Sequence, residues 1–356
     1  MHQNRLCMNS KAMFSKKPIA LFMASLSLAV VVIALVHPTS MSSVRLPFIK
    51  SEPLNSISGR PGGDGPVLVV KIDDTRASHP QIGLEDADII YVEQVEGGLT
   101  RLAAVFSSKI PDRIGPVRSA RVSDIELLAQ YGRVGFAYSG AQSKFRPVLA
   151  QANIENLSAE RNSSQIYTTD PARIPPYAMV LRADLLMQSI SDKGIMLEKS
   201  KSMGWSFGAA PKIGKAVSDI HLSWPASSYD AHWSEKEKRW LLDHAGQENL
   251  AETGVQLGAS TLVIQKVSIT PSIYKDKVGG VTPFSATVGS GSGYIARNGK
   301  VFAAKWNRAS EDAGTSWTAV NGEEITFEKG QIWVALVDKE PVFTEPIADA
   351  TTSIPK

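Results

Sequence analysis

The sequence predicts an α+β protein with a mixed α/β domain at 66–204, a β-rich and mostly antiparallel domain at 205–340, and a single N-terminal transmembrane helix. Up to residue 204, strand-like and helix-like segments mix without a clean repeat. Further along the chain, the Asn-Gly pairs at 298–299 and 321–322 predict tight hairpins, because both residue types tolerate a positive φ. Near the N-terminus, residues 19–36 form an 18-residue run without a charge, long enough to cross a bilayer as a helix.

The first 65 residues are expected to lie outside the folded domains. Residues 1–17 carry four basic residues and no acid, which predicts a cytoplasmic tail. Residues 18–37 then predict a signal anchor that makes the chain a single-pass protein of the cell membrane, with the rest of it extracytoplasmic. A cleaved signal peptide and a buried core helix are the alternatives, but the run is long and no A-x-A-like site follows it. Residues 38–65, rich in Pro, Ser and Gly, predict a flexible linker, and 341–356 a C-terminal tail.

The predicted exported part is nearly neutral. The chain has 38 basic and 35 acidic residues, and removing the four basic residues of the tail leaves 34. This balance argues against nucleic acid as a partner. The one cysteine, Cys7, precedes the apolar run. It can therefore neither form a disulfide within the exported part nor serve as a lipoprotein attachment site, so stability must come from the core.

Apolar runs and turn residues predict the elements of the first domain. Ser123 and Glu126 have the spacing of a capping box, and Gly132 stands where a helix would end. Residues 153–176, which are polar and contain three prolines, predict an irregular segment. Strands are predicted at 67–72, 89–92, 102–106 and 134–138, and helices at 123–131, 143–151 and 183–191.

The second domain is expected to consist mainly of hairpins. Residues 229–233 and 239–243 read as hairpin arms around a charged turn, with a helix over 234–242 as the alternative. The run Gly289–Gly293 resembles a phosphate loop, but no helix follows it, so it predicts a turn or bulge. Other strands are predicted at 261–269, 285–288, 294–297, 301–306, 317–320, 324–327 and 331–337.

The best candidate site is an arginine-rich loop. Residues 113–121 hold three arginines in nine positions around a Gly-Pro pair, just before a predicted helix N-terminus, which favours anions. Guanidinium groups bind carboxylate or phosphate in a planar fork. The alternative is that these arginines pair with acids of the fold, namely Asp73, Asp74, Glu93 and Glu96. The residues predicted to bind an anionic ligand are Arg101, Arg118, Arg121, Ser119, Glu96, Gly97 and Gly98.

Catalytic signals are weak. Ser139 lies in a sequence that resembles a nucleophile elbow with alanine in place of both glycines, and a small-residue turn is the preferred interpretation. A hydrolase would need His221, His232 or His244 as its base, and all three lie in the β-rich half. Glu96 and Asp73 are the other weak candidates, as acid and base. The six histidines form no close pair in the sequence, so no metal site and no cofactor are predicted.

Two motifs resemble the YerB-like family of predicted bacterial lipoproteins: EGGLTR at 96–101 and RIGPVRSAR at 113–121. Supporting matches are VKID at 70–73 and the C-terminal pattern GSGSGYIARNGKVFAAKW with GQIWVALVD. The resemblance spans about 67–338. It implies an extracytoplasmic protein of two parts, found mainly in Gram-positive bacteria, with no established activity. This chain departs from the family in lacking a lipobox cysteine and in having PYAMVL at 176–181, where relatives are more polar.

Together these observations predict a membrane-tethered, extracytoplasmic binding protein of the cell envelope. Its ligand would be anionic, such as a cell-wall fragment or a peptide carboxylate, bound through the arginine-rich loop. A cell-envelope hydrolase and a protein–protein scaffold at the membrane are the alternative functions.

Overall fold

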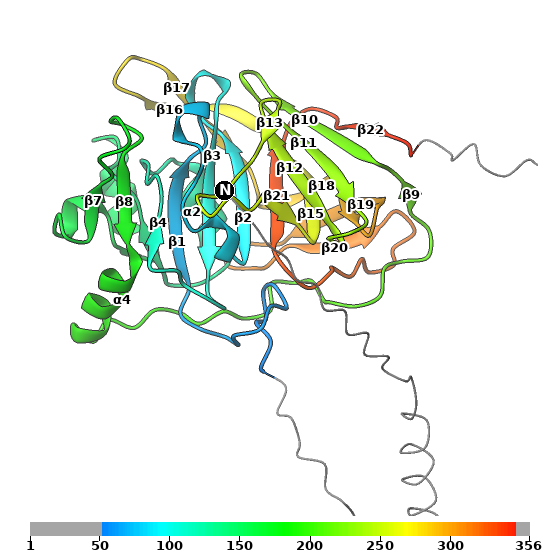
Figure 1. Ribbon diagram of the computed structural model, residues 1–356, viewed down its shortest axis with the longest axis horizontal. Coiled ribbons are helices and arrows are strands. Elements are labelled where there is room, and N and C mark those ends of the chain that lie inside the picture. Colours follow the sequence, from blue (N-terminus) through cyan, green and yellow to red (C-terminus); the bar gives the residue numbers. More distant parts are fainter. Residues whose placement is uncertain (1–51, 347–356) are drawn as a thin grey trace, which may run out of the picture. The chain divides into compact units, whose positions relative to one another are not determined.

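An 11-stranded sheet runs through the part of the chain that the computed structural model describes, residues 52–346 (Figure 1). Its strands in chain order are β1 (Leu68–Asp73), β2 (Ile89–Gln94), β3 (Thr100–Phe106), β5 (Val134–Ala137), β6 (Ile154–Asn156), β9 (Lys215–Ala216), β15 (Thr261–Lys266), β18 (Gly289–Arg297), β19 (Lys300–Arg308), β20 (Ser316–Ala319) and β21 (Ile332–Val337). In space their order is β20-β19-β18-β15-β21-β2-β3-β1-β5-β6, and β9 pairs with β19.

The pairing of β2 with β21 makes this sheet continuous. The two strands run parallel, with Ile89 opposite Ile332 and Val92 opposite Ala335. On its other edge β21 pairs with β15, also in parallel, and every residue of β21 is buried. A strand covered on both faces is expected to be apolar throughout, as the sequence IWVALV is. The structure therefore joins residues of both predicted domains, 66–204 and 205–340, in one sheet.

Three smaller sheets complete the fold. The largest of them, the second sheet, has the order β13-β12-β11-β10-β22, with β14 paired to β12. Its apolar residues share a core with the large sheet. Its strands are β10 (Asp219–Trp224), β11 (Ser227–Ser234), β12 (Arg239–His244), β13 (Gln247–Glu248), β14 (Gly258–Ala259) and β22 (Val342–Thr344). The other two sheets are β16 (Ile269–Lys275) with β17 (Val281–Ser285), and β4 (Arg113–Ile114) with β8 (Met179–Arg182) and β7 (Tyr167–Thr169).

Helices are short in the described part of the chain. The α-helices there are α2 (Ser123–Ala129), α3 (Arg146–Gln151) and α4 (Ala183–Asp192). Single 3₁₀ turns are η1 (Arg76–Ser78), η2 (Leu84–Asp86), η3 (Glu96–Gly98) and η4 (Ala159–Arg161).

The predicted α+β class is therefore wrong, and within residues 52–346 the protein is mostly β. Three α-helices of seven, six and ten residues stand there against 22 strands. The prediction gave the helices too much weight, because the connections between the central strands are 3₁₀ turns and irregular loops. The structure also gives no support to a transmembrane helix: no helix within 52–346 has the length and apolar character to span a bilayer. The predicted tail at 1–17, helix at 18–37 and residues 347–356 lie outside the described residues.

Several local predictions can be compared with the structure. The hairpin at 229–243 is confirmed, because β11 and β12 pair in antiparallel register. The turn predicted at Gly289–Gly293 is wrong, since these residues begin β18. Glycine is needed inside this strand because a Cβ on Gly293 would lie 2.2 Å from the carbonyl oxygen of Ile264. The capping box is also wrong: no side chain caps α2, and Ser123 instead accepts a hydrogen bond from the amide of Ser285.

Each face of the large sheet carries its own apolar core. Along β1, Leu68, Val70 and Ile72 belong to the core shared with the second sheet, while Val69 belongs to the core on the face of α2. This alternation is the period of two expected for a strand. The segment 52–65, part of the predicted linker, packs against this unit, and Ile57 there is fully buried. The alternation decides which side chains reach the site described next.

Candidate functional site

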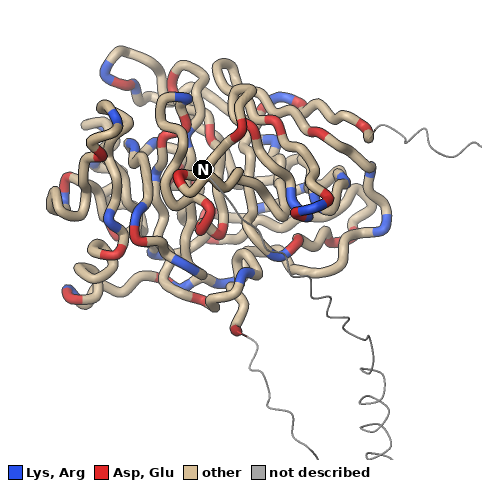
Figure 2. The backbone as a smooth tube through the Cα atoms, in the orientation of Figure 1, with Lys and Arg blue, Asp and Glu red and all other residues tan. Residues whose placement is uncertain are grey.

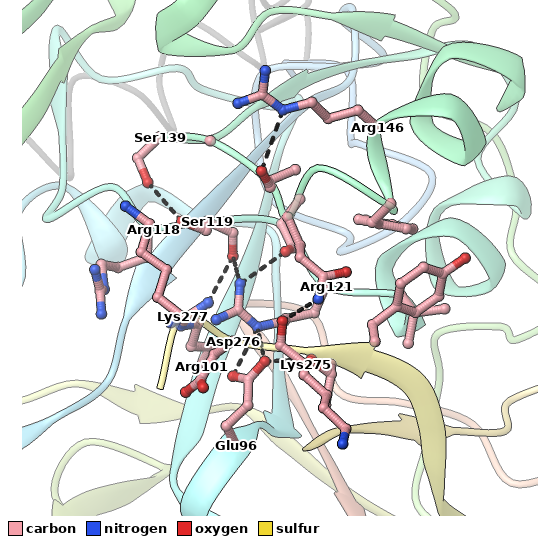
Figure 3. Close-up of a pocket in the computed structure, with 18 of the residues that line it drawn as sticks. Glu96, Arg101, Arg118, Ser119, Arg121, Ser139, Arg146, Lys275, Asp276 and Lys277 are labelled. Atoms are coloured by element: carbon pink, nitrogen blue, oxygen red, sulfur yellow. Dashed lines mark hydrogen bonds and ion pairs between the residues drawn. The ribbon is translucent and has the colours of Figure 1, made fainter. Parts of the chain in front are cut away.

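A cavity of about 670 Å³ opens at one end of the central strands of the large sheet, where β1 and β2 end and β3 begins (Figure 3). Its wall also includes the loop before α2, the loop after β5 and the tip of the β16–β17 hairpin. Among its lining residues are six cationic side chains and three carboxylates: Arg101, Arg118, Arg121, Arg146, Lys275, Lys277, and Glu96, Glu160, Asp276. Ser119 and Ser139 line it as well. The predicted ligand-binding side chains Arg101, Arg118, Arg121, Ser119 and Glu96 thus meet at one cavity.

Arg101 is the most deeply buried cation of this cavity, with 7% of its surface exposed. Its guanidinium donates a hydrogen bond of 2.9 Å to the carbonyl oxygen of Ser119. Within residues 52–346, Arg101 makes no ion pair, although Asp73 and Glu93 stand directly opposite it on the two neighbouring strands. Burial, together with the charges of Arg121 and Arg118, lowers the pKa of Arg101 to about 9.

The two acids opposite Arg101 are held by other cations. Asp73 is buried and pairs with Arg118, which is 22% exposed and whose guanidinium also lies 6.0 Å from the ring of Tyr177. Asp73 further accepts a hydrogen bond of 2.8 Å from the amide of Thr75. Glu93 pairs with Lys71. The sheet register therefore brings two carboxylates next to Arg101, but among the described residues neither forms an ion pair with it. The charges of Glu96 and Asp73 still favour its charged form from a distance.

Arg121 and Glu96 form the second ion pair at the cavity wall, at 2.7 Å. Glu96 also accepts a hydrogen bond from the hydroxyl of Thr282, on β17. Burial alone would raise the pKa of Glu96, but the charge of Arg121 and the hydrogen bonds from Thr282 and Arg121 hold this pKa below its ordinary value. Glu96 is therefore ionised at neutral pH and fixes the direction of the Arg121 side chain.

Beneath the cavity lies an ionic cluster that sequence reasoning missed. Lys71 is fully buried in β1 and pairs with Glu93 and, at 2.8 Å, with Asp124 of α2. Burial lowers the pKa of Lys71 to about 8, against the favourable charge of Asp124. Asp124 also accepts a hydrogen bond of 2.6 Å from the amide of Arg121. A lysine inside the buried strand LVVKID was the available signal, because buried lysines are normally paired.

The remaining predicted residues lie in and around the same loops. Gly97 and Gly98 both have positive φ and form η3 with Glu96, but neither lines the cavity. The Ser139 hydroxyl lies 3.2 Å from that of Ser119. Among the described residues no histidine lines the cavity, so none of the three proposed bases stands beside Ser139. The described residues thus give this serine no activating partner of the kind a hydrolase needs.

The side chains of Asp73 and Asp74 point to opposite faces of the large sheet. Asp74 accepts hydrogen bonds from Tyr229 and Thr100 and lies near two histidines, His79 and His244. The rings of these histidines stack with their centroids 4.6 Å apart. They are 165 positions apart in the chain, so a search for close pairs in the sequence could not find them.

Charged residues are interspersed over the described part of the chain (Figure 2). Blue and red segments alternate along the tube, in agreement with the near-neutral balance of the predicted exported part. The cationic lining of the cavity is therefore a local feature.

Comparison with solved structures identifies the same fold in the crystal structure of the YerB protein from Bacillus subtilis. The similarity covers 83% of this chain and 100% of that chain, with a TM-score of 0.72 and 18% sequence identity. In sequence, the chain is 27% identical over 134 residues to "Putative lipoprotein YerB" of Bacillus subtilis (strain 168). That alignment spans 38% of this chain and 40% of the relative's length.

Two family descriptions match the chain in succession. "Protein of unknown function (DUF3048) N-terminal domain" matches residues 56–196, and the corresponding C-terminal domain matches 220–334. The first match holds the arginine-rich loop and β1 to β3, and the second holds the β16–β17 hairpin that closes the cavity. The chain therefore belongs to the YerB-like family of two successive DUF3048 domains, to which no function has been assigned.

Proposed function

We propose that this protein is an extracytoplasmic binding protein of the bacterial cell envelope, and that it holds an anionic ligand in the arginine-lined cavity. The location is supported by the name of the Bacillus subtilis relative, "Putative lipoprotein YerB", since lipoproteins are attached on the outer side of the cytoplasmic membrane. The binding role is argued from the cavity itself.

The main support for the proposal is that Arg101 is buried and makes no ion pair within residues 52–346. A buried cation without a countercharge costs free energy, and proteins normally pair such groups or keep them in water. Here the register places Asp73 and Glu93 opposite Arg101, yet Arg118 and Lys71 hold these acids. An anion in the cavity would be a direct ionic partner for Arg101 and would accept hydrogen bonds from the guanidinium.

The cavity also suggests the chemical class of the ligand. Its volume of about 670 Å³ lies within the range of roughly 300–1,000 Å³ that is usual for small-molecule sites. Apolar surface from Phe145, Tyr274 and Pro176 faces the same space as the cations. A ligand with a carboxylate and an apolar or amide-rich body fits both kinds of surface. We therefore expect a short peptide or a peptide-bearing cell-wall fragment with a free carboxylate.

A titration of the purified full chain with a muropeptide tests this function. The probe is a disaccharide peptide with free carboxylates, and its fully amidated form is the matched ligand control. Arg101→Met removes the unpaired charge and keeps most of the side-chain volume. We expect Arg101→Met to weaken muropeptide binding by about 10- to 100-fold, the usual cost of losing a charge-assisted hydrogen bond.

Arg133→Met is the control for the loss of an arginine elsewhere. Arg133 is exposed and pairs with Glu155, away from the lining of the cavity. Its substitution should leave the affinity unchanged. Equal affinity of the wild type and Arg101→Met, or equal affinity for the free and amidated probes, would contradict a carboxylate-binding role for this cavity.

A further inference from the structure

On the side of the sheet away from the cavity, three potential metal ligands lie close together. The Nε2 atom of His79 is 3.6 Å from one oxygen of Asp74, and the Nε2 atom of His244 is 3.8 Å from the other. One ligand atom of each residue lies within 4.8 Å of those of the other two. Asp74 and His244 are buried, and His79 keeps only 16% of its side chain exposed.

These separations are close to those of a zinc site. Zinc binds imidazole nitrogen and carboxylate oxygen at about 2.0–2.2 Å, so the ligand atoms of a tetrahedral site lie about 3.4 Å apart. The two distances to Asp74 exceed this spacing by a few tenths of an ångström. Each distance runs to a different carboxylate oxygen, and the two imidazole rings stack with an interplanar angle of 11°. Rotation of both rings out of this stack would bring three ligand atoms around one ion.

Gln81 is an independent observation that points to the same place. Its side chain is fully buried, and its Nε2 lies 3.1 Å from Nε2 of His79 and 3.4 Å from an oxygen of Asp74. Its Oε1 is buried and has no hydrogen-bond partner within residues 52–346. A 180° rotation of the amide exchanges the two atoms and places the oxygen toward His79 and Asp74. This rotation gives up the contact of 3.4 Å that Nε2 makes with the carbonyl oxygen of Asp73. The otherwise unsatisfied oxygen would then be available as a fourth ligand.

The surrounding groups hold the carboxylate in place. Tyr229 donates a hydrogen bond of 2.7 Å to one oxygen of Asp74, and Thr100 donates one of 2.5 Å to the other. The hydroxyl of Ser227 lies 3.2 Å from Nε2 of His244 and 2.9 Å from the hydroxyl of Thr100. The hydrogen bonds from Tyr229 and Thr100 are of the kind that orient ligating carboxylates in metal sites. The Ser227 hydroxyl contacts the nitrogen that would bind the ion, so the ion would displace this contact.

We propose that Asp74, His79 and His244, with Gln81 as fourth ligand, bind one divalent transition-metal ion, for which Zn²⁺ is the best match. All four protein positions would be filled, which is typical of a structural rather than a catalytic site. Asp74, His79 and Gln81 lie in the first family domain and His244 in the second. The ion would therefore tie the two domains together, and this role is independent of the anion-binding cavity.

Calorimetric titration of the metal-stripped full chain with Zn²⁺ tests the site. We expect one equivalent to bind, and at a Zn²⁺ concentration of 100 times Kd we expect Tm to rise by about 5 °C. His79→Ala and His244→Ala should weaken binding at least 100-fold and abolish the rise in Tm. His221→Ala and His232→Ala remove surface histidines that contact aspartates, so they should keep both effects.

X-ray absorption of the zinc-loaded wild type needs no variant. It should show two imidazole nitrogens and two oxygens around the metal. Absence of zinc binding in the wild type would overturn the proposal. So would binding that survives both His79→Ala and His244→Ala, binding lost in His232→Ala, or an absorption spectrum with one imidazole or none.

Discussion

At the scale of the residue, two adjacent aspartates take part in different clusters. Asp73 ends β1 and faces the arginine-lined cavity, where it pairs with Arg118. Asp74 faces the second sheet and accepts a hydrogen bond from Tyr229. The alternation of a strand explains the split, because successive side chains point to opposite faces. The same alternation leaves Arg101 on the cavity side with its nearest acids already paired.

Substitution of Arg101 and Arg118 should therefore affect stability in opposite ways. Arg101→Met removes an unpaired buried charge, so the free energy of unfolding should stay the same or rise by about 1 kcal/mol. Arg118→Met leaves Asp73 buried without its partner, and we expect a loss of about 2 kcal/mol, reduced by the partial exposure of Arg118. Urea unfolding measures both. A large loss of stability in Arg101→Met would mean that Arg101 has a structural partner.

The pH dependence of anion binding provides a second test at this scale. Burial and two neighbouring arginines lower the pKa of Arg101 to about 9, so the empty site loses this charge as the pH rises through that value. From pH 8 to pH 10 the charged fraction falls about tenfold, and the affinity for an anion should fall by the same factor.

N-acetyl-D-alanyl-D-alanine is a suitable probe for this measurement, because its carboxylate keeps its charge over the whole range. Arg101→Met should bind it weakly and with no tenfold change between pH 8 and pH 10. A wild-type affinity that stays constant over this range would show that Arg101 does not titrate with the ligand.

Sequence could predict much of the candidate site but not its pairing. The arginines, Ser119 and Glu96 lie in two short motifs, and a loop between strand and helix was enough to single them out. Which acid pairs with which arginine depends on the strand register and on Lys71, which takes Glu93 as its partner. Residue composition gives no sign of this pairing. His79, just after η1, and His244, at the end of β12, meet only because the fold brings distant parts of the chain together.

At the scale of the element, the connection between β2 and β3 positions the cavity. η3 begins with Glu96, which pairs with Arg121, and ends with Gly98, whose carbonyl oxygen accepts a hydrogen bond from the amide of Ala226. Gly98 has a φ of +73°, and a Cβ there would lie 2.5 Å from Cβ of Pro225. One short turn thus holds a cavity residue and also contacts the second sheet.

Gly98→Ala and Gly97→Ala form a matched pair for this turn. Both positions have a φ near +70°, but a Cβ on Gly97 would meet no atom within 4 Å. Gly97→Ala should cost only about 1 kcal/mol of unfolding free energy, the strain of a positive φ. Gly98→Ala should cost about 2–3 kcal/mol, since the clash with Pro225 adds to that strain. Equal losses in thermal or urea unfolding would show that contact with Pro225 is unimportant.

Glycine-containing segments predicted turns correctly only where the glycine is required by the turn itself. Asn298-Gly299 correctly predicts a hairpin, because the positive φ values of a tight turn are a local requirement. The turn predicted at 289–293 is wrong, since Gly291 and Gly293 are required by the close approach of Trp306 and Ile264 from neighbouring strands. A requirement imposed by another strand leaves no signature within the segment itself.

At the scale of the whole molecule, the two family domains share one sheet through the parallel pairing of β2 with β21. Both domains also contribute residues to the cavity and to the group formed by Asp74, His79 and His244. Sequence predicted many of the strands but not that the two parts of the chain share one sheet, because parallel pairing between distant strands has no local pattern. The mostly β class was missed for a related reason, since much of the sheet is assembled from short strands.

The shared sheet predicts how the protein unfolds. Residues 52–346 should unfold in one cooperative transition by far-UV circular dichroism and tryptophan fluorescence, because separation of the domains would expose the apolar edges of β2 and β21. The isolated segment 56–196 should be aggregated or unfolded. Two separated transitions, or a soluble and folded 56–196, would show that the domains are independent.

A crystal structure of the protein bound to N-acetyl-D-alanyl-D-alanine tests the central claim most directly. The account predicts density for the carboxylate in the cavity within hydrogen-bonding distance of the Arg101 guanidinium, with the Arg118–Asp73 and Arg121–Glu96 pairs retained. Density for the carboxylate elsewhere on the protein, or a guanidinium of Arg101 paired with Glu93 or Asp73 instead, would contradict it.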